Sequence, residues 1–192
     1  MYFQGKVLKS DKFAVAVVGS RLMSPRGKAL TEKFVKELVK NKITIVSGLA
    51  RGIDTVAHKT AIENKGRTIA VLGSGLDIIY PPENVELAKS VSENGALVSP
   101  FPKGTKPIGA NFLARNRVIV SLSLAVLVIE GAGRSGTLST ASWAANMGVE
   151  VFAIPGSPAT DWLIEQGASI AKRPKDVIQY LNANAINIED GA

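Results

Sequence analysis

The chain of 192 residues contains no cysteine and only one histidine, His58. The lack of cysteine excludes a disulfide scaffold, a thiolate nucleophile and a zinc site held by cysteine. One histidine is too few for a histidine-rich metal site, and any Ser-His-Asp triad would have to use His58. We therefore expect no metal, no cofactor and no catalytic residues, which makes a binding protein a better hypothesis than an enzyme.

Long hydrophobic runs are missing as well. The longest apolar runs span about six residues, far fewer than the roughly 20 that a helix needs to cross a bilayer. No secretory signal pattern opens the chain. These features predict a cytoplasmic protein that does not enter a membrane.

Acidic residues are outnumbered by basic ones, 16 against 23, so the formal net charge is +7. This surplus favours an anionic partner, although many soluble proteins carry as much charge. A hydrophobic fraction of 46% is enough for a core, and the length fits one domain. Residues 1–5 (MYFQG) resemble the remnant of a cleavable tag, so residues 1–6 are set aside. We assign 1–12 to this remnant or extension, 13–182 to the domain and 183–192 to a polar tail.

Short apolar runs alternate with longer amphipathic stretches along the chain. The runs predicted as strands are 13–18, 43–46, 68–72, 96–98, 125–129 and 150–154. The stretches predicted as helices are 25–38, 54–65, 84–93, 110–122, 137–147, 161–166 and 174–181. Continuous apolar strands joined by helices imply a parallel sheet covered on both faces. The fold class is therefore α/β, a doubly wound and mostly parallel Rossmann-like sheet of six or more strands.

Glycine-rich loops follow all six predicted strands, and most of them add serine, arginine or lysine. In doubly wound sheets, ligands bind beyond the carboxyl ends of the strands. Glycine lets the backbone approach a ligand, while helix N-termini and Arg side chains attract phosphate. We therefore predict a phosphate-binding surface, although turns of this kind can be glycine-rich for conformational reasons alone. Its candidate residues are Gly19, Ser20, Arg21, Ser47, Gly48, Arg51, Gly73, Ser74, Gly75, Lys103, Lys106, Arg134, Ser135 and Gly136.

A basic stretch with aromatic neighbours runs from Lys103 to Arg117, with four cations and no acid. Arg115 and Arg117 lie about 200° apart on a helix, so only one of them can face a given ligand. Basic groups beside aromatic rings suit single-stranded nucleic acid, whose bases stack while its phosphates follow the charge. Phe101 is the preferred stacking residue, and Phe112 is expected in the core.

Two carboxylates could carry chemistry instead. Asp54 and His58 are four residues apart on a predicted helix and form either a catalytic dyad or, as we prefer, a local hydrogen bond. Glu130 ends the fifth predicted strand and is the best-placed carboxylate for an acid. A lone carboxylate without an acid partner is thin evidence for catalysis.

Seven segments together resemble the DNA-processing protein A (DprA/Smf) family, in order and spacing, across about residues 13–170. They are 18–21 (VGSR), 47–54 (SGLARGID), 70–77 (AVLGSGLD), 115–119 (RNRVI), 134–138 (RSGTL), 151–157 (VFAIPGS) and 163–168 (LIEQGA). The resemblance implies an extended Rossmann fold that binds single-stranded DNA, loads the RecA recombinase in transformation or recombination, and forms a homodimer. By position, the phosphate pocket would use Gly19, Ser20 and Arg21 with help from Arg115 and Arg117. Pro82 stands where the family usually carries a basic residue that contacts DNA.

Two alternatives share this fold. A phosphoribohydrolase-like enzyme would use Gly136 and Thr137 for phosphate and Glu130 as acid, but the glutamate that follows such a motif is missing. A small-nucleotide sensor would hold a mononucleotide in the same loops. An NAD or ATP site is disfavoured, because residues 131–136 match Gly-x-Gly-x-x-Gly only after the fifth strand, and no Gly-Lys-Ser/Thr occurs.

Overall fold

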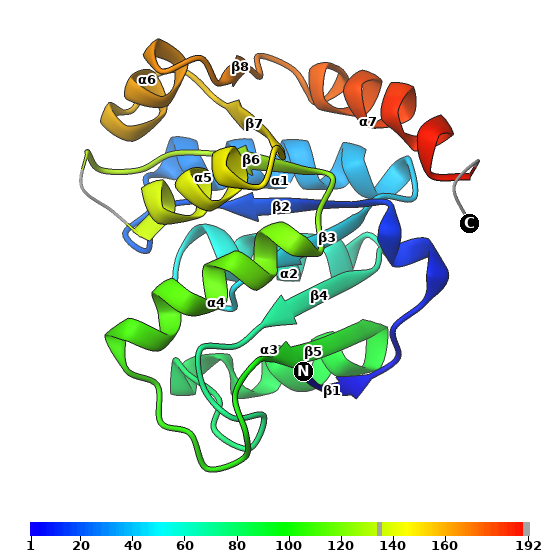
Figure 1. The fold of residues 1–192 in the computed structure, drawn as a ribbon, viewed down its shortest axis with the longest axis vertical. Helices are drawn as coiled ribbons and strands as arrows, with labels where there is room; N and C mark the ends of the chain where they lie inside the picture. Colours follow the sequence, from blue (N-terminus) through cyan, green and yellow to red (C-terminus); the bar gives the residue numbers. More distant parts are fainter. Residues whose placement is uncertain (134–135, 190–192) are drawn as a thin grey trace.

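An 8-stranded sheet, with the strand order β1-β5-β4-β3-β2-β6-β7-β8, organises the chain in a computed structural model that describes residues 1–133 and 136–189. The strands are β1 (Tyr2–Gly5), β2 (Ala14–Val18), β3 (Thr44–Ser47), β4 (Thr68–Val71), β5 (Gly95–Ser99), β6 (Ala125–Val128), β7 (Glu150–Ala153) and β8 (Ser169–Ile170). The helices are α1 (Pro25–Lys40), α2 (Ile53–Glu63), α3 (Val85–Asn94), α4 (Gly109–Ser121), α5 (Gly136–Asn146), α6 (Pro158–Glu165) and α7 (Pro174–Glu189), with short 3-10 turns η1 (Lys9–Lys12) and η2 (Pro82–Asn84). Figure 1 shows helices in front of and behind the sheet.

The six predicted strands all form, as β2 to β7, and they pair in parallel with one another. The predicted doubly wound, mostly parallel α/β fold is therefore confirmed. β1 and β8 were not predicted. β8 has only two residues, and β1 comes from the segment set aside as tag-like, where it pairs antiparallel to β5 with all four residues exposed.

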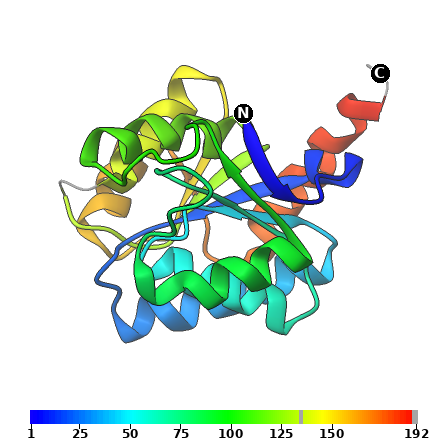
Figure 2. The same cartoon turned by 90° about the horizontal axis from the view of Figure 1, so that it is seen from below.

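Alternate residues of the parallel strands β2 to β7 pack on opposite faces of the sheet. Val15 and Val17 of β2 pack with α1, α2 and α7, whereas Ala14, Ala16 and Val18 pack with α4, α5 and α6. A third cluster joins α3 to β4 and β5. The two helical layers are plain in the edge view of Figure 2.

The carboxyl ends of β2 to β7 lie along one edge of the sheet, because these strands are parallel. The six glycine-rich loops therefore share that edge, as predicted. β2 lies between β3 and β6, so the strand order changes direction at β2, which is where such sheets place a ligand crevice.

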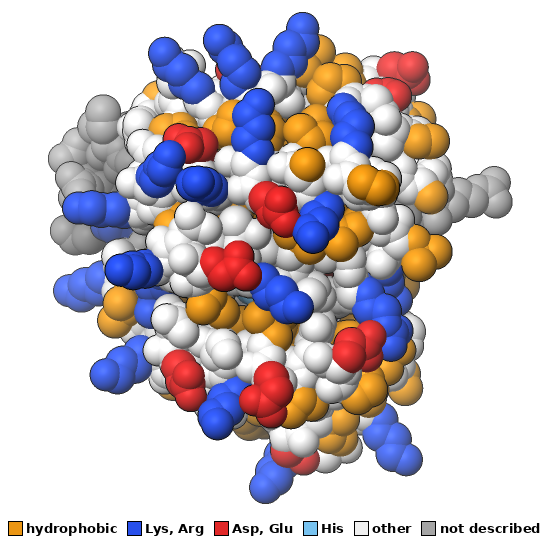
Figure 3. Space-filling view, turned by 180° about the vertical axis from the view of Figure 1, so that it is seen from behind, with side chains coloured by type: hydrophobic (Ala, Val, Ile, Leu, Met, Phe, Trp, Pro, Cys, Tyr) orange, Lys and Arg blue, Asp and Glu red, His pale blue; other side chains and the backbone are white. Residues whose placement is uncertain are grey.

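Lysines are spread over the outer surface of the helices behind the sheet. Lys28, Lys33, Lys36 and Lys40 of α1 are exposed, and Figure 3 shows basic and acidic side chains interleaved over this face. Much of the basic surplus therefore lies on a solvated surface. In the described part of the chain, no helix is both long and apolar enough to span a bilayer. α7 continues past its predicted end at residue 181 to Glu189, into the segment assigned to a polar tail.

Candidate nucleic-acid interface

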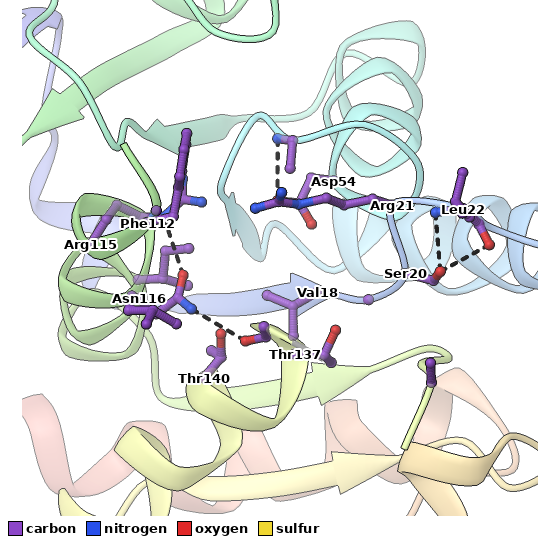
Figure 4. A pocket seen from close by; sticks show the side chains of 17 residues that line it. Val18, Ser20, Arg21, Leu22, Asp54, Phe112, Arg115, Asn116, Thr137 and Thr140 are labelled. Carbon is purple, nitrogen blue, oxygen red and sulfur yellow. Dashed lines mark hydrogen bonds between the residues drawn. The ribbon is translucent and has the colours of Figure 1, made fainter. Parts of the chain in front are cut away.

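A pocket of about 670 Å³ opens at the point where the strand order changes direction. Its walls come from the loop after β2, the start of α2, and helices α4 and α5, as Figure 4 shows. This volume falls in the range of about 300–1,000 Å³ that is typical of small-ligand sites. Of the predicted phosphate-binding residues, Gly19, Ser20, Arg21, Arg115 and Gly136 line this pocket.

Arg21 is the exposed cation of the pocket. It follows β2 directly, and its guanidinium carbon lies 5.4 Å from the centre of the Phe112 ring. Phe112 is half-buried on α4, lines the pocket, and has Arg115 on it as well, 5.8 Å from the ring centre. The site thus combines an exposed guanidinium with an aromatic ring, a pair that suits a phosphate and a base.

Arg115 forms the floor of the pocket and is only 3% exposed. Its Nη1 donates to the carbonyl of Gly48 at 2.6 Å and to the carbonyl of Val71, and its Nε donates to Asn116 Oδ1 at 3.2 Å. Burial lowers the pKa of Arg115 to about 10, opposed by the nearby Asp54 carboxylate and assisted by Arg21. Arg115 stays charged at neutral pH, and none of the described hydrogen bonds uses its Nη2.

Asp54 holds the loop that connects β3 to α2. Its carboxylate accepts from the backbone N–H of Gly48 at 3.1 Å and of Ala50 at 3.4 Å. Burial raises the pKa of Asp54, while the Arg115 charge and these backbone N–H groups oppose the rise. Asp54 lies in the first turn of α2, where a carboxylate complements the helix dipole.

The preferred hydrogen bond between Asp54 and His58 does not form. His58 Nδ1 pairs with Thr68 Oγ1 at 2.7 Å, and the Thr68 hydroxyl donates to the carbonyl of Ile45 at 2.9 Å. His58 is fully buried, and this burial, with a smaller effect of Arg115, lowers its pKa to about 3. A neutral, buried imidazole bonded to a threonine is not poised for a dyad with Asp54.

Glycines at two positions let segments approach closely. A Cβ at Gly19 would lie 2.7 Å from the Ile53 side chain and 2.9 Å from the Glu130 carbonyl oxygen. A Cβ at Gly73 would lie 2.5 Å from the Phe112 ring. Gly73 does not line the pocket, but its lack of a side chain leaves the space in which the ring sits.

Serines in the predicted set mainly hold the loops. The Ser20 hydroxyl donates to the Leu22 carbonyl at 2.9 Å and accepts from the Leu22 N–H at 3.1 Å. Ser47 is buried and donates to the Val17 carbonyl at 2.7 Å, and Ser74 is buried and donates to the Ile78 carbonyl at 2.6 Å. Ser47 and Ser74 therefore support the edge without lining the pocket.

Several predicted residues lie away from the pocket. Phe101 and Lys103 line a second hollow together with residues of β1, so the ring at the main pocket belongs to Phe112. Gly75 is buried and bonds to the Thr105 carbonyl at 2.9 Å, while Lys106 is exposed on the same loop. Arg134 and Ser135 lie outside the described residues.

Two further predicted arginines are exposed outside the pocket. Arg117 lies over the Trp143 ring at 5.6 Å, on the other side of α4 from Arg115, as their spacing predicted. Arg51 forms an ion pair with Glu83 and lies over Tyr80.

Glu130 is committed to a structural role. Its two carboxylate oxygens accept from the backbone N–H and the hydroxyl of Ser24, each at 2.6 Å. Ser24 is the N-cap of α1 and also accepts from the Gly27 N–H. Glu130 thus anchors the start of α1, and it does not line the pocket.

Sequence reasoning missed part of the lining. Asn116 and Thr140 line the pocket, as does Thr137, which was named only for the enzyme alternative, and Asn116 Nδ2 donates to the Gly136 carbonyl at 3.3 Å. The available signal was spacing, because Phe112, Arg115 and Asn116 recur at three and four residues on one face of α4. Within residues 1–133 and 136–189, no group of three His, Cys, Asp or Glu side chains could hold a metal ion.

Comparisons of sequence and of structure find known proteins that are similar to this chain. Residues 1–182 match the family model of DNA recombination-mediator protein A, and this match includes the tag-like segment. Protein Smf of Escherichia coli is 45% identical over 188 residues, which cover 94% of this chain and 50% of that protein.

Two solved structures are close in fold. The DNA processing protein A of Streptococcus pneumoniae has a TM-score of 0.87 at 42% identity, covering 92% of this chain and 64% of that one. The protein of the same name from Helicobacter pylori, described by its single-stranded DNA binding mode, has a TM-score of 0.87 at 32% identity. That match covers 95% of this chain and 86% of the other.

The chain spans about half the length of Protein Smf of Escherichia coli.

Proposed function

Because the chain belongs to the DNA recombination-mediator protein A family, we propose that it binds single-stranded DNA without sequence preference in the pocket beside β2. One observation carries this proposal: the exposed Arg21 guanidinium lies 5.4 Å from the Phe112 ring within one pocket. A phosphate would take the guanidinium donors, and the adjacent base would stack on the ring. Neither contact reads a base edge, so the affinity would depend little on sequence.

The remaining groups of the pocket fit a polyanion. Arg115 adds a buried positive charge at the floor, and Gly19 exposes backbone next to Arg21. Thr137 lies in the first turn of α5 and points into the pocket in Figure 4, where the positive end of the helix favours a phosphate. We propose a binding protein rather than an enzyme, because Glu130 is held by Ser24 and His58 is buried.

The test is fluorescence anisotropy with a labelled oligothymidylate, at low and moderate salt. We expect micromolar or tighter binding that weakens with salt, because phosphate contacts release counterions. Arg21→Ala should abolish most of the binding and lower the salt slope by about 0.7, the value for one phosphate contact on a single strand. Arg173→Ala is the matched control, since Arg173 is exposed at the start of α7 and does not line the pocket. Absence of binding by the wild type at low salt would refute the proposal.

We further propose that the chain assists RecA loading on single-stranded DNA in the cytoplasm. Support comes from family membership. The expected result is faster assembly of RecA on single-stranded DNA in the presence of this chain, measured by DNA-dependent ATP hydrolysis. An unchanged assembly rate at saturating chain would refute the role for this segment.

A homodimer is the other proposed assembly. β8 ends the described sheet, and Trp162 of α6 and Ile170 of β8 are 47% and 46% exposed beside this edge. An exposed sheet edge flanked by apolar side chains suits pairing with a second copy. Light scattering after size exclusion should give a dimer for the wild type and a monomer for Trp162→Glu. A monomeric wild type at high concentration would refute it.

A further inference from the structure

A row of two aromatic rings with an arginine at each end leads out of the pocket. Arg21 lies 5.4 Å from the Phe112 ring centre, the Phe112 ring lies 5.6 Å from the Tyr80 ring, and the Arg51 guanidinium lies 5.9 Å from Tyr80. Tyr80 is 38% exposed, so its side chain is accessible from solvent. Stacking rings and guanidinium groups in this order form a path that a single strand can follow.

The last cation of this row is not free. Arg51 Nε lies 2.5 Å from Glu83 Oε1, and Arg51 Nη2 lies 3.0 Å from Glu83 Oε2. This two-point geometry is the one in which a guanidinium also binds a phosphate. The Glu83 carboxylate therefore occupies the donors that a DNA phosphate would use.

Both partners of this ion pair are held by the fold. Asn84, next to Glu83, donates to the Leu49 carbonyl at 2.9 Å and to Thr55 Oγ1 at 2.8 Å. These bonds fix η2 against the loop that carries Arg51. Glu83 and Arg51 thus face each other because their backbones are tied together, not only because their charges attract.

The ion pair is nevertheless easy to break. Both side chains are 51% exposed, and exposed pairs typically shift an equilibrium by at most about fivefold. The hydrogen bond from Arg51 holds the pKa of Glu83 below its usual range, so this carboxylate is charged at neutral pH. A phosphate on a bound strand could displace it at small cost.

We propose that Glu83 is a built-in competitor of DNA, which occupies Arg51 in the free protein and is displaced when a strand leaves the pocket across Tyr80. The inference rests on the proposed function, and it extends the binding surface from the pocket to Arg51. A strand short enough to fill only the pocket does not reach Arg51. A longer strand exchanges the Glu83 carboxylate for one of its own phosphates.

The test is a double-mutant cycle with wild type, Glu83→Gln, Arg51→Ala and the double variant, measured by anisotropy on tri- and dodecathymidylate. Glu83→Gln should bind the dodecamer about two- to fivefold more tightly, as expected for loss of an exposed pair. Arg51→Ala should weaken dodecamer binding and lower its salt slope by about 0.7. In the Arg51→Ala background, Glu83→Gln should give no further gain.

Glu93→Gln is the matched control, because it removes the same charge at the exposed far end of α3. An equal gain from Glu93→Gln, or a gain that persists without Arg51, would show a general charge effect and overturn the inference. An equal gain on the trimer would also overturn it. If Arg21→Ala loses binding while Glu83→Gln equals wild type on both lengths, the proposed function stands and this inference fails. A wild type that binds neither length refutes both.

Discussion

Replacing Arg115 by methionine should lower the stability of the folded protein, in addition to any loss of a DNA contact. Methionine keeps the apolar stem and removes the guanidinium. The carbonyls of Gly48 and Val71 then lose the donor that binds them, and the buried Asp54 carboxylate loses its nearest balancing charge. These changes fall on the loop after β3 and on the end of β4, which support the pocket.

The size of the effect follows from these two carbonyls. A buried acceptor left without a donor costs about 1–3 kcal/mol, so two cost about 2–6 kcal/mol. Domains are stable by only about 5–15 kcal/mol in total. For a chain of 192 residues, 1 kcal/mol shifts the melting temperature by roughly 2–4 °C, so a fall of at least about 4 °C is expected.

Arg21→Ala provides the contrast, because Arg21 is exposed and the substitution removes no buried hydrogen bond. Such surface changes alter stability by about 0.5 kcal/mol or less, or roughly 2 °C here. Thermal melts and urea titrations followed by circular dichroism, with anisotropy on the same samples, separate the two arginines. Arg115→Met that melts within 2 °C of wild type while losing DNA would refute the structural role of Arg115.

Two further predictions concern buried and aromatic side chains. Because burial lowers the pKa of His58 to about 3, the unfolded chain binds more protons than the folded one below pH 6.5, so stability falls as the pH falls. From pH 7.5 to 5 this loss of stability is about 2 kcal/mol, at 1.36 kcal/mol per pH unit. His58→Asn should remove the loss, measured by urea titrations at the two pH values. A loss of the same size in His58→Asn would contradict this assignment to His58. Phe112→Leu should weaken oligothymidylate binding by about 1–3 kcal/mol, the value of one stacked base, whereas Phe101→Leu should not. Equal losses in anisotropy would place the stacking surface elsewhere.

The sheet was predictable because its signal is local. Each of β2 to β7 contains a short apolar run, and parallel strands must bring their following loops to one edge. β8 carries no such signal, since its two residues become a strand only by pairing with Phe152 and Ala153. β1 likewise depends on β5 as a partner, and its exposed residues show no alternation between a buried and a solvated face.

The site was predictable in part. Gly19, Ser20 and Arg21 were expected at a phosphate pocket because they follow a strand directly. Phe112 was expected in the core, since an apolar residue on a helix gives no sign of whether its face leans over a cavity. Its position depends on the space at Gly73, a residue from a different strand end.

The role of Arg115 could not be predicted for a related reason. Its sequence neighbours, Asn116 and Arg117, indicate a basic helix but not which backbone carbonyls the side chain will meet. Those acceptors, Gly48 and Val71, belong to distant segments, so the interaction exists only in the folded chain.

The pairing of β2 with β6 links two halves of the chain that are far apart in sequence. Arg21 and Asp54 come from the first half of the pocket, and Phe112, Arg115 and Thr137 come from the second. A single strand of DNA bound as proposed would hold the two halves together, since neither half alone supplies the whole lining of the pocket. At a ligand concentration of 100 times Kd, such binding adds about 2.7 kcal/mol to the stability of the assembled fold. Resistance to proteolysis should therefore rise when DNA is added, because bound DNA stabilises the fold that forms its binding site.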